Sequence, residues 1–479
     1  MFNVYKEIAD SYKGKRFHII GIGRSGVGSA RLLDILGADV NISDNRDADM
    51  LGQYLQDIPE NVRTFTGMQD SSLVDNIDCL VLSPGVPRDI DIVKRALESS
   101  VDVIGEVELA FSVLKNLSVL CGFDLRWYGV TGTNGKSTTV TLLYEMLKAG
   151  GYNASLTGNI GYPLSEKAVE LLIAAKNGLE IGRTDIVLEL SSFQLELIRE
   201  LKLNISSVLN ITEDHLDRYE DMTRYADAKS RIFNGQGDLD MAVINADDEM
   251  SMEISENCKA DKYFVSTRSK VKGIFAMGDV VSLKVNDNIE NLCLASEIRT
   301  KGIHNLYNSM TAALIAYLAG VSQGIIASVL KEFPGLEHRL ETVAIIDGVT
   351  VYNDSKGTNV GAVIKSLESF EGGIILIAGG RDKNGDFGSL VPYIKNRVKG
   401  LVLIGEAAEK IKKAVIDVID PQMAGSLKDA VEIALSMAGR GDTVLFSPAC
   451  ASFDMFIDYE DRGRQFKQIV RDISGSMGQ

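Results

Sequence analysis

WYGVTGTNGKSTT, residues 127–139, is the stretch from which the rest of the chain can be interpreted. A short apolar strand runs into a glycine-rich turn, and the apolar residues of 140–147 then recur at helical spacing. This is the pattern of a phosphate-binding loop, although Val130 stands at the first glycine position of the strict motif. We expect ATP use, with Lys136 on the β- and γ-phosphates and Ser137 on Mg²⁺; a turn that only opens a helix is the alternative. The predicted loop residues are Gly132, Thr133, Asn134, Gly135, Lys136, Ser137 and Thr138.

Length and composition indicate a multidomain protein of the cytosol. The 479 residues suggest about three domains, and the 45% hydrophobic content is enough for several cores. The net charge of −16 argues against a nucleic-acid or anionic-membrane partner, because phosphate surfaces need a basic patch. The five cysteines are odd in number and lack C-x-x-C spacing, as expected for reduced thiols. Neither a signal peptide nor a membrane-spanning run is found, so we expect a cytoplasmic location.

The N-terminal part of the chain has the pattern of a nucleotide-binding α/β domain. An apolar strand leads into GIGRSG (residues 21–26), a helix is expected over 27–36, and a second strand ends at Asp44. This is a dinucleotide fingerprint, but the same geometry holds any diphosphate against a helix N-terminus. Asp44 is either a ribose-binding acid or an ordinary turn or N-cap residue. His18, inside the first strand, is expected in the core.

Two polar residues lie at the carboxyl ends of central strands, at the sheet edge where the phosphate loop is expected. The apolar strand 185–190 carries Glu189 near its carboxyl end, where a buried carboxylate needs a partner or a metal. We interpret Glu189 as the acid that holds the Mg²⁺ of ATP; an ion-paired strand-end residue is the alternative. His215 follows the next strand, 207–211, at the same edge, and a solvated loop histidine is its alternative.

Beyond the phosphate loop, the pattern changes twice. Residues 264–293 have short β-like repeats that predict an antiparallel flap or edge sheet. An Ala-rich helix follows, with Asn305 and Asn308 three apart on one face. Strand-loop-helix units then recur from 349 to 446, and their polar loops predict a further parallel α/β sheet.

Together these motifs resemble the Mur ligase family. GVTGTNGKST, TGNIG, ELSSFQLE, NITEDHLDRY, GLEHR, NDSKGTN, GGRDKNGDF and SPACASFDMFIDYEDRG follow one another in the family's order over essentially the whole chain. The resemblance implies an α/β fold of three domains. These are an N-terminal Rossmann-like domain at 1–104 for a UDP-linked substrate, a central P-loop ATPase domain with a mainly parallel sheet at 105–334, and a C-terminal Rossmann-like domain at 335–479 that binds D-glutamate and closes on ATP.

The resemblance also implies metal-site roles that the residue pattern alone does not assign. Lys136 and Ser137 would bind the ATP phosphates and one Mg²⁺, which Glu189 helps to hold. His215 and Lys229 would serve a second Mg²⁺, with Lys229 carbamylated. Without the family, Lys229 would be interpreted as a solvated helix lysine.

Three further sets of residues would contact substrates, if the resemblance holds. Asn305 and Asn308 are expected to contact adenine. Arg339 and Asp354, in the third domain, are expected to contact ATP. D-Glutamate is expected on Lys356, Thr358, Lys383, Ser452 and Tyr459. The UDP-linked substrate is expected on Arg24, Ser25, Asp44, Asn45, Ser83 and Asn159. Arg24 is larger and more basic than the residue expected at that place in the family.

The implied reaction joins D-glutamate to UDP-N-acetylmuramoyl-L-alanine through an acyl phosphate, releasing ADP and phosphate, and the enzyme is expected to be a monomer. The base that deprotonates the amine is not assigned, and His215 is one candidate.

Two other functions are alternatives to this ligase activity. A pyridine-nucleotide dehydrogenase would explain the N-terminal fingerprint but not Lys136 or Glu189. A folylpolyglutamate-synthase-like ligase shares the ATP core, yet typically lacks an N-terminal domain of this kind.

Overall fold

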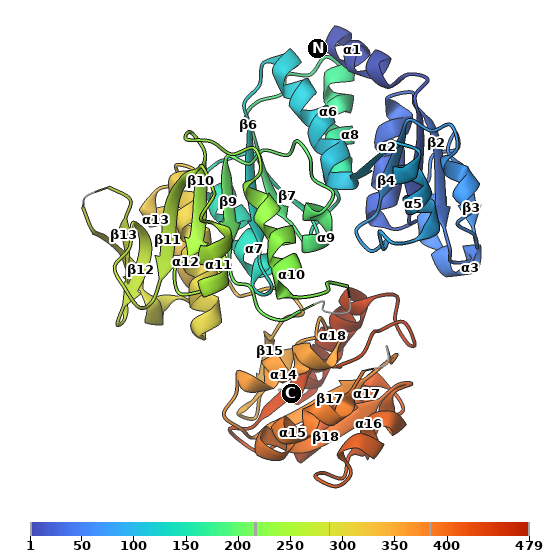
Figure 1. Cartoon of the computed structure of the whole chain (residues 1–479). Helices are drawn as coiled ribbons and strands as arrows, with labels where there is room; N and C mark the ends of the chain where they lie inside the picture. Colours follow the sequence, from blue (N-terminus) through green and yellow to red (C-terminus); the bar gives the residue numbers. More distant parts are fainter. Residues whose placement is uncertain (1, 215–217, 287, 383–384, 478–479) are drawn as a thin grey trace. The chain divides into compact units, whose positions relative to one another are not determined.

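The computed structural model describes residues 2–214, 218–286, 288–382 and 385–477. The chain forms two compact units, Met1–Phe333 and Pro334–Gln479. The first unit contains a five-stranded and a nine-stranded sheet, and the second contains a six-stranded sheet (Figure 1). Each sheet is accompanied by helices, so the predicted α/β class with three sheet-based domains is confirmed. The exact limits of the three predicted domains stay a prediction.

The N-terminal sheet is parallel throughout, in the order β3-β2-β1-β4-β5. Its strands are β1 (Arg16–Ile20), β2 (Asp39–Asp44), β3 (Arg63–Thr66), β4 (Cys79–Leu82) and β5 (Asp102–Gly105). The helix after the glycine turn, α2 (Arg24–Ile35), begins before the predicted residue 27. A Cβ on Gly26 would lie 1.9 Å from the Gly21 carbonyl oxygen, so only glycine lets the helix start this close to the strand. His18 is fully buried, as expected, and its Nε2 lies 2.8 Å from Ser43 Oγ.

The central sheet is parallel from β7 to β12 and antiparallel at one edge, in the order β14-β13-β12-β11-β10-β9-β6-β8-β7. Its strands are β6 (Leu125–Thr131), β7 (Ala154–Gly158), β8 (Thr184–Glu189), β9 (Ile205–Val208), β10 (Met241–Asn245), β11 (Asp261–Ser266), β12 (Gly273–Met277), β13 (Val280–Lys284) and β14 (Glu290–Leu294). Of the two predicted alternatives, a flap or an edge sheet, the antiparallel strands β12-β13-β14 form the edge sheet. Every residue of β8 is buried, as expected for an inner strand of a parallel sheet.

Helices join the two sheets of the first unit into one body. The α-helices of this unit are α1 (Phe2–Tyr12), α2, α3 (Ala48–Leu51), α4 (Gln53–Gln56), α5 (Asp91–Glu98), α6 (Glu106–Cys121), α7 (Lys136–Ala149), α8 (Leu164–Lys176), α9 (Ser192–Leu195), α10 (Met222–Ser230), α11 (Glu249–Ile254), α12 (Ile303–Leu318) and α13 (Gln323–Glu332). Helices α6 and α8 run side by side, and one apolar cluster continues from the N-terminal sheet through them into the central sheet (Figure 1). The two sheets of this unit therefore share a core.

The second unit has a mixed sheet in the order β15-β16-β20-β17-β18-β19, which corrects the prediction of a wholly parallel one. Its strands are β15 (Glu341–Ile346), β16 (Val349–Asn353), β17 (Ile374–Gly379), β18 (Val398–Ile404), β19 (Gln422–Met423) and β20 (Thr443–Phe446). Strands β15 and β16 form an antiparallel hairpin. Its turn residues Asp347 and Gly348 have φ of 50° and 81°, the positive values that an Asp-Gly hairpin turn uses.

Helices of the second unit flank this sheet, and α18 is the longest of those described. They are α14 (Val360–Glu368), α15 (Val391–Arg397), α16 (Ala408–Val415), α17 (Leu427–Met437) and α18 (Tyr459–Met477). Across the described residues of both units, no helix combines the length and the apolar composition that crossing a bilayer would need.

Candidate active site

The phosphate loop connects β6 to α7 and is held open by two glycines. Gly132 and Gly135 have φ of 151° and 88°, which other residues rarely adopt. A Cβ on Gly135 would lie 2.1 Å from Asn308 Oδ1, so α12 packs directly against the loop. Lys136 Nζ donates to the carbonyl oxygens of Gly132 (2.7 Å) and Thr133 (2.9 Å). The lysine thus lies over the loop where an anion would bind, and the structure brings the predicted Asn308 to the same place.

Glu189 ends β8 beside the phosphate loop, because its register partner on β6 is Val130. Its side chain is only 2% exposed. One carboxylate oxygen, Oε1, accepts a 2.7 Å hydrogen bond from Asn159 Nδ2. The other, Oε2, is buried without a hydrogen-bond partner among the described residues. No ion pair of Glu189 is found in the described part of the chain, so this oxygen is an unsatisfied acceptor of the kind that a cation would satisfy.

Lys229 lies on the buried face of α10 and is 1% exposed. Its Nζ donates to the Gly132 carbonyl oxygen (2.9 Å) and lies 4.5 Å from the centre of the Tyr225 ring. Burial, together with a smaller effect of the nearby positive charge of Lys136, lowers the pKa of Lys229 to about 6. The sequence contained a signal for this burial, since Tyr225, Ala226 and Ala228 share the helix with Lys229 at positions that form one face.

A cavity of about 250 Å³ lies between the N-terminal and central sheets of the first unit. Its lining comes from both sheets and comprises Gly23, Arg24, Ser25, Ser83, Pro84, Gly158, Asn159, Gly161, Pro163 and Gln194. The structure therefore brings together four residues predicted to bind the UDP-linked substrate: Arg24, Ser25, Ser83 and Asn159. Asn159 also donates to Glu189, so the cavity wall and the buried acid are linked by a hydrogen bond.

Gln194 also lines this cavity, although the sequence did not predict it as a site residue. Its Oε1 accepts from the Ser191 amide (2.9 Å) and hydroxyl (3.0 Å) in a capping box that starts α9. Its Nε2 is left buried with no hydrogen-bond partner among the described residues. The S-x-x-Q spacing in ELSSFQLE was visible as a helix start, but the spare donor depends on packing.

In the second unit, a buried arginine ties together the loops that carry the predicted acceptor residues. Arg462 on α18 donates to the Ser355 hydroxyl (3.0 Å) and carbonyl (2.8 Å), and to the carbonyls of Cys450 (3.2 Å) and Ala451 (3.1 Å). The Ser355 hydroxyl in turn donates to the Tyr459 carbonyl (2.8 Å). These contacts hold the segments of Lys356, Thr358, Ser452 and Tyr459 at one edge of the sheet.

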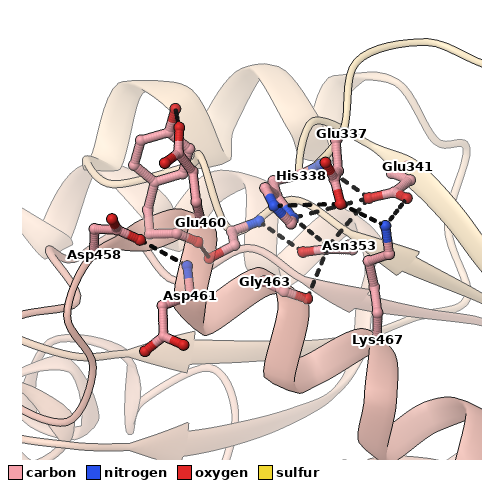
Figure 2. A network of polar contacts seen from close by, with 11 residues as sticks. Glu337, His338, Glu341, Asn353, Asp458, Glu460, Asp461, Gly463 and Lys467 are labelled. Carbon is pink, nitrogen blue, oxygen red and sulfur yellow. Dashed lines mark hydrogen bonds and ion pairs between the residues drawn. The ribbon is translucent and has the colours of Figure 1, made fainter.

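A network of charges surrounds the loop that carries Arg339. Glu337, His338 and Glu341 approach one another closely enough to suggest a metal site. Figure 2 shows instead that Lys467 contacts both carboxylates, with Nζ–Oε1 distances of 2.8 Å to Glu337 and 2.6 Å to Glu341. His338 Nδ1 lies 2.9 Å from Asn353 Nδ2 in the same network (Figure 2). The lysine already neutralises the carboxylates, so we do not assign a metal here.

Three models of known protein families match the chain in order. They are the Mur ligase MurD-like N-terminal domain (residues 15–105), the Mur ligase middle domain (130–316) and the Mur ligase glutamate ligase domain (338–450). The chain is also 41% identical to the UDP-N-acetylmuramoylalanine–D-glutamate ligase of Thermoanaerobacter sp. (strain X514), over 96% of this chain and 99% of that protein. The chain belongs to the Mur ligase family. The Geotalea daltonii ligase of the same name is 40% identical, over 97% of this chain and 98% of its own length.

Two solved structures share the fold of this chain. The UDP-N-acetylmuramate-alanine ligase MurC of Thermotoga maritima superposes with a TM-score of 0.56, at 18% identity, over 95% of this chain and 99% of that one. A pseudomurein peptide ligase type C of Methanothermus fervidus gives 0.53, also at 18% identity, over 96% and 100%. At this identity, the likeness concerns the fold alone.

Several residues that the Mur ligase resemblance singled out lie elsewhere or outside the described chain. His215 and Lys383 are outside the described residues. Asp44 is buried and accepts hydrogen bonds from the amides of Ile22 (2.8 Å) and Arg46 (2.9 Å) and from the Arg46 guanidinium; neither it nor Asn45 lines the cavity. Its role as a ribose ligand stays a prediction.

The residues predicted to contact ATP outside the phosphate loop differ in burial and in their hydrogen-bond partners. Asn305 donates to the Lys301 carbonyl (2.8 Å) at the start of its own helix. Asp354 is buried, and its carboxylate accepts from the hydroxyls of Ser366 and Ser447, both at 2.6 Å. Burial raises the pKa of Asp354, against the opposing effect of these hydrogen bonds. Arg339 is exposed, between two residues of positive φ, His338 (63°) and Leu340 (44°). Contacts of these residues with ATP stay predictions.

Proposed function

We propose that the chain is the D-glutamate-adding Mur ligase, which joins D-glutamate to UDP-N-acetylmuramoyl-L-alanine with ATP in peptidoglycan precursor synthesis. The observation that carries this proposal is the 41% identity, over 96% of the chain, to a ligase of that name. The phosphate loop, the buried Glu189 and the cavity between two nucleotide-fold sheets fit the same function. A pyridine-nucleotide dehydrogenase would leave Lys136 and the unsatisfied Glu189 oxygen without a purpose.

The residues at the phosphate loop fit Mg²⁺. The unsatisfied Glu189 Oε2 and the Ser137 hydroxyl at the start of α7 are oxygen donors, which Mg²⁺ prefers. Bound there with ATP, Mg²⁺ would neutralise charge on the phosphate oxygens. Lys136 adds a second positive charge, and the backbone amides at the start of α7 face the anion.

The proposed reaction has two steps. A carboxylate oxygen of the UDP-linked substrate attacks the γ-phosphorus of ATP, the bond to ADP breaks, and an acyl phosphate forms. The amine of D-glutamate then attacks the acyl carbon, a proton leaves the nitrogen, and phosphate departs as the amide bond forms. Asn159 lies on the cavity wall and is bonded to Glu189, so it is positioned to orient the substrate end that reacts.

Lys229 is proposed to carry a carbamate when the enzyme is active. It is buried beside the phosphate loop, and its only described hydrogen bond is to the Gly132 carbonyl. A carbamate would replace the buried amine by an anionic oxygen ligand beside the phosphate loop. The lowered pKa of Lys229, about 6, also leaves a neutral amine at pH 8, the form that reacts with carbon dioxide. A second Mg²⁺, with His215, belongs to this proposal, as do a monomeric state and a cytoplasmic location.

The function is tested by phosphate release with UDP-N-acetylmuramoyl-L-alanine and a panel of D- and L-amino acids. We expect release only when D-glutamate, the UDP-linked substrate, ATP and Mg²⁺ are all present. Preference for another amino acid, or release that does not need the UDP-linked substrate, would overturn the proposal. Mass spectrometry of the product identifies the dipeptide directly.

Glu189→Gln is expected to raise the Mg²⁺ concentration needed for half-maximal activity by about tenfold or more, because a neutral amide is a weaker Mg²⁺ ligand than a carboxylate. The measurement is phosphate release as a function of Mg²⁺ concentration. Glu200→Gln, at an exposed glutamate paired with Lys115, is the control and should leave the Mg²⁺ dependence unchanged. Equal Mg²⁺ curves for Glu189→Gln and the wild type would remove Glu189 from the metal site.

Lys356→Ala is expected to raise the KM for D-glutamate by roughly tenfold to a hundredfold, since a charge-assisted contact to a carboxylate is lost. The KM for ATP should change much less, because the phosphate loop lies in the other unit. Lys399→Ala, which removes a lysine paired with Asp442 in the same unit, is the matched control. Both constants are measured by steady-state kinetics. Equal increases for both substrates would mean that Lys356 does not serve the acceptor.

A further inference from the structure

Glu106 lies at the covalent link between the two sheets of the first unit. Strand β5 ends at Gly105, and α6 begins at Glu106. The Glu106 side chain is only 2% exposed. Its Oε1 accepts a 2.6 Å hydrogen bond from the Ser165 amide, and its Oε2 has no hydrogen-bond partner among the described residues. The junction therefore holds a buried carboxylate that is bonded to the backbone at the start of α8.

That contact supplies a cap that α8 lacks. The N-cap of α8 is Pro163, whose side chain offers no acceptor, and no side-chain cap is formed locally. The first amides of a helix need acceptors, and a carboxylate there is also favoured by the helix dipole. Glu106 provides this acceptor from another helix. Burial raises the pKa of Glu106 to about 7, while the Ser165 hydrogen bond opposes the shift.

The start of α8 is also a wall of the cavity. The cavity lining includes Gly158, Asn159, Gly161 and Pro163, the loop that runs directly into α8. This loop is itself bonded to β8, since the Asn159 amide donates to the Glu189 carbonyl (2.9 Å). A displacement at the start of α8 would therefore move the residues that line the cavity.

The opposite wall of the cavity also packs against the start of α8. Helix α2, whose first residues Arg24 and Ser25 line the cavity, packs on the start of α8. A Cβ on Gly28 would lie 2.5 Å from Ser165 Oγ. Arg31 on α2 forms a 3.1 Å ion pair with Glu166 on α8. The first turn of α8 is thus the point where the two walls meet.

We infer that Glu106 is a positioning residue for the cavity that takes the UDP-linked substrate: its carboxylate fixes the start of α8, and with it the distance between the two walls. This inference rests on the proposed function, which assigns that substrate to the cavity. Glu106 does not line the cavity, so it acts through α8 and the loop before it.

The same helix offers a matched control. Glu108 is 4% exposed and accepts backbone hydrogen bonds from Glu200 (2.7 Å) and Leu201 (3.3 Å). It is a buried carboxylate in the first turn of α6, as Glu106 is, but it caps a segment that does not line the cavity. Replacing Glu108 should lower the stability of the protein without changing its affinity for the UDP-linked substrate.

The test is equilibrium binding of UDP-N-acetylmuramoyl-L-alanine to the full-length protein by calorimetry, together with steady-state kinetics. Glu106→Ala is expected to raise the Kd roughly tenfold, because an unpaired buried amide destabilises the native start of α8. The KM for ATP and D-glutamate should stay near their wild-type values. Glu106→Gln keeps an oxygen acceptor for Ser165 and should restore most of the affinity. Glu108→Ala should leave the Kd unchanged.

The other possible results of this experiment also support or refute the role of Glu106. If Glu106→Ala does not fold, Glu106→Asp takes its place, since its shorter side chain withdraws the acceptor while keeping the charge. An unchanged Kd in the folded variant would overturn the inference, as would an equal loss in Glu108→Ala. If the wild type does not bind UDP-N-acetylmuramoyl-L-alanine at all, the proposed function fails first. Wild-type binding with unaffected variants refutes only the role of Glu106.

Discussion

Lys136→Ala is expected to lower the rate of phosphate release by about a hundredfold or more, because a cation aimed at the transferring phosphoryl group is lost. The variant should fold normally. In the structure, Lys136 Nζ donates to the loop carbonyls of Gly132 and Thr133. The measurement is kcat under saturating ATP, UDP-linked substrate and D-glutamate.

The matched control for this prediction is Lys148→Ala. Lys148 is exposed in the last turn of α7, the same helix that Lys136 begins. It should keep wild-type activity, so any effect of Lys136→Ala cannot be ascribed to a lysine lost from this helix. Phosphate release near the wild-type rate in Lys136→Ala would refute the phosphate-loop assignment.

Lys229→Ala is expected to lose activity by about a hundredfold or more and to regain part of it when a short carboxylic acid such as acetate is added. The alanine leaves a space beside the Gly132 carbonyl in which a small carboxylate can replace the oxygens of the proposed carbamate. Activity is measured as a function of acetate concentration. In the wild type, labelling with ¹³C-bicarbonate should give a carbamate resonance that Lys229→Ala lacks.

Lys167→Ala is the control for this second experiment. Lys167 is also buried, with a 5% exposed side chain, but it is neutralised by an ion pair with Glu170 at 2.8 Å. Its variant should show neither rescue by acetate nor loss of the resonance. A fully active wild-type enzyme with a free Lys229 amine in its intact mass would contradict the carbamate.

The sequence alone was enough to predict those features that depend on neighbouring residues. The phosphate loop is a strand, a glycine turn and a helix start in succession, so Lys136 and Ser137 could be placed from their spacing. Glu189 was predicted as a metal ligand because a carboxylate ending an apolar strand needs a partner; the structure leaves its Oε2 unsatisfied among the described residues, and the metal role stays a prediction. The parallel sheets followed from the repeated strand-loop-helix pattern.

The resemblance to the family added residues that spacing could not supply. Lys229 was named only through it, because a lysine on a short polar helix normally faces water. The mixed sheet of the second unit was missed because strands were predicted only from residue 349 onward, so the antiparallel hairpin that the Asp347–Gly348 turn closes was not foreseen.

Only the tertiary structure decided what is buried and what meets across the fold. The burial of Lys229 beside Gly132, the packing of Asn308 on Gly135, the cavity between two sheets and the cap that Glu106 gives to α8 all join segments far apart in sequence. The physical reason is that desolvation and close packing depend on three-dimensional neighbours. A linear pattern can name a residue that is able to bind or to cap, but the folded chain selects the partner it meets.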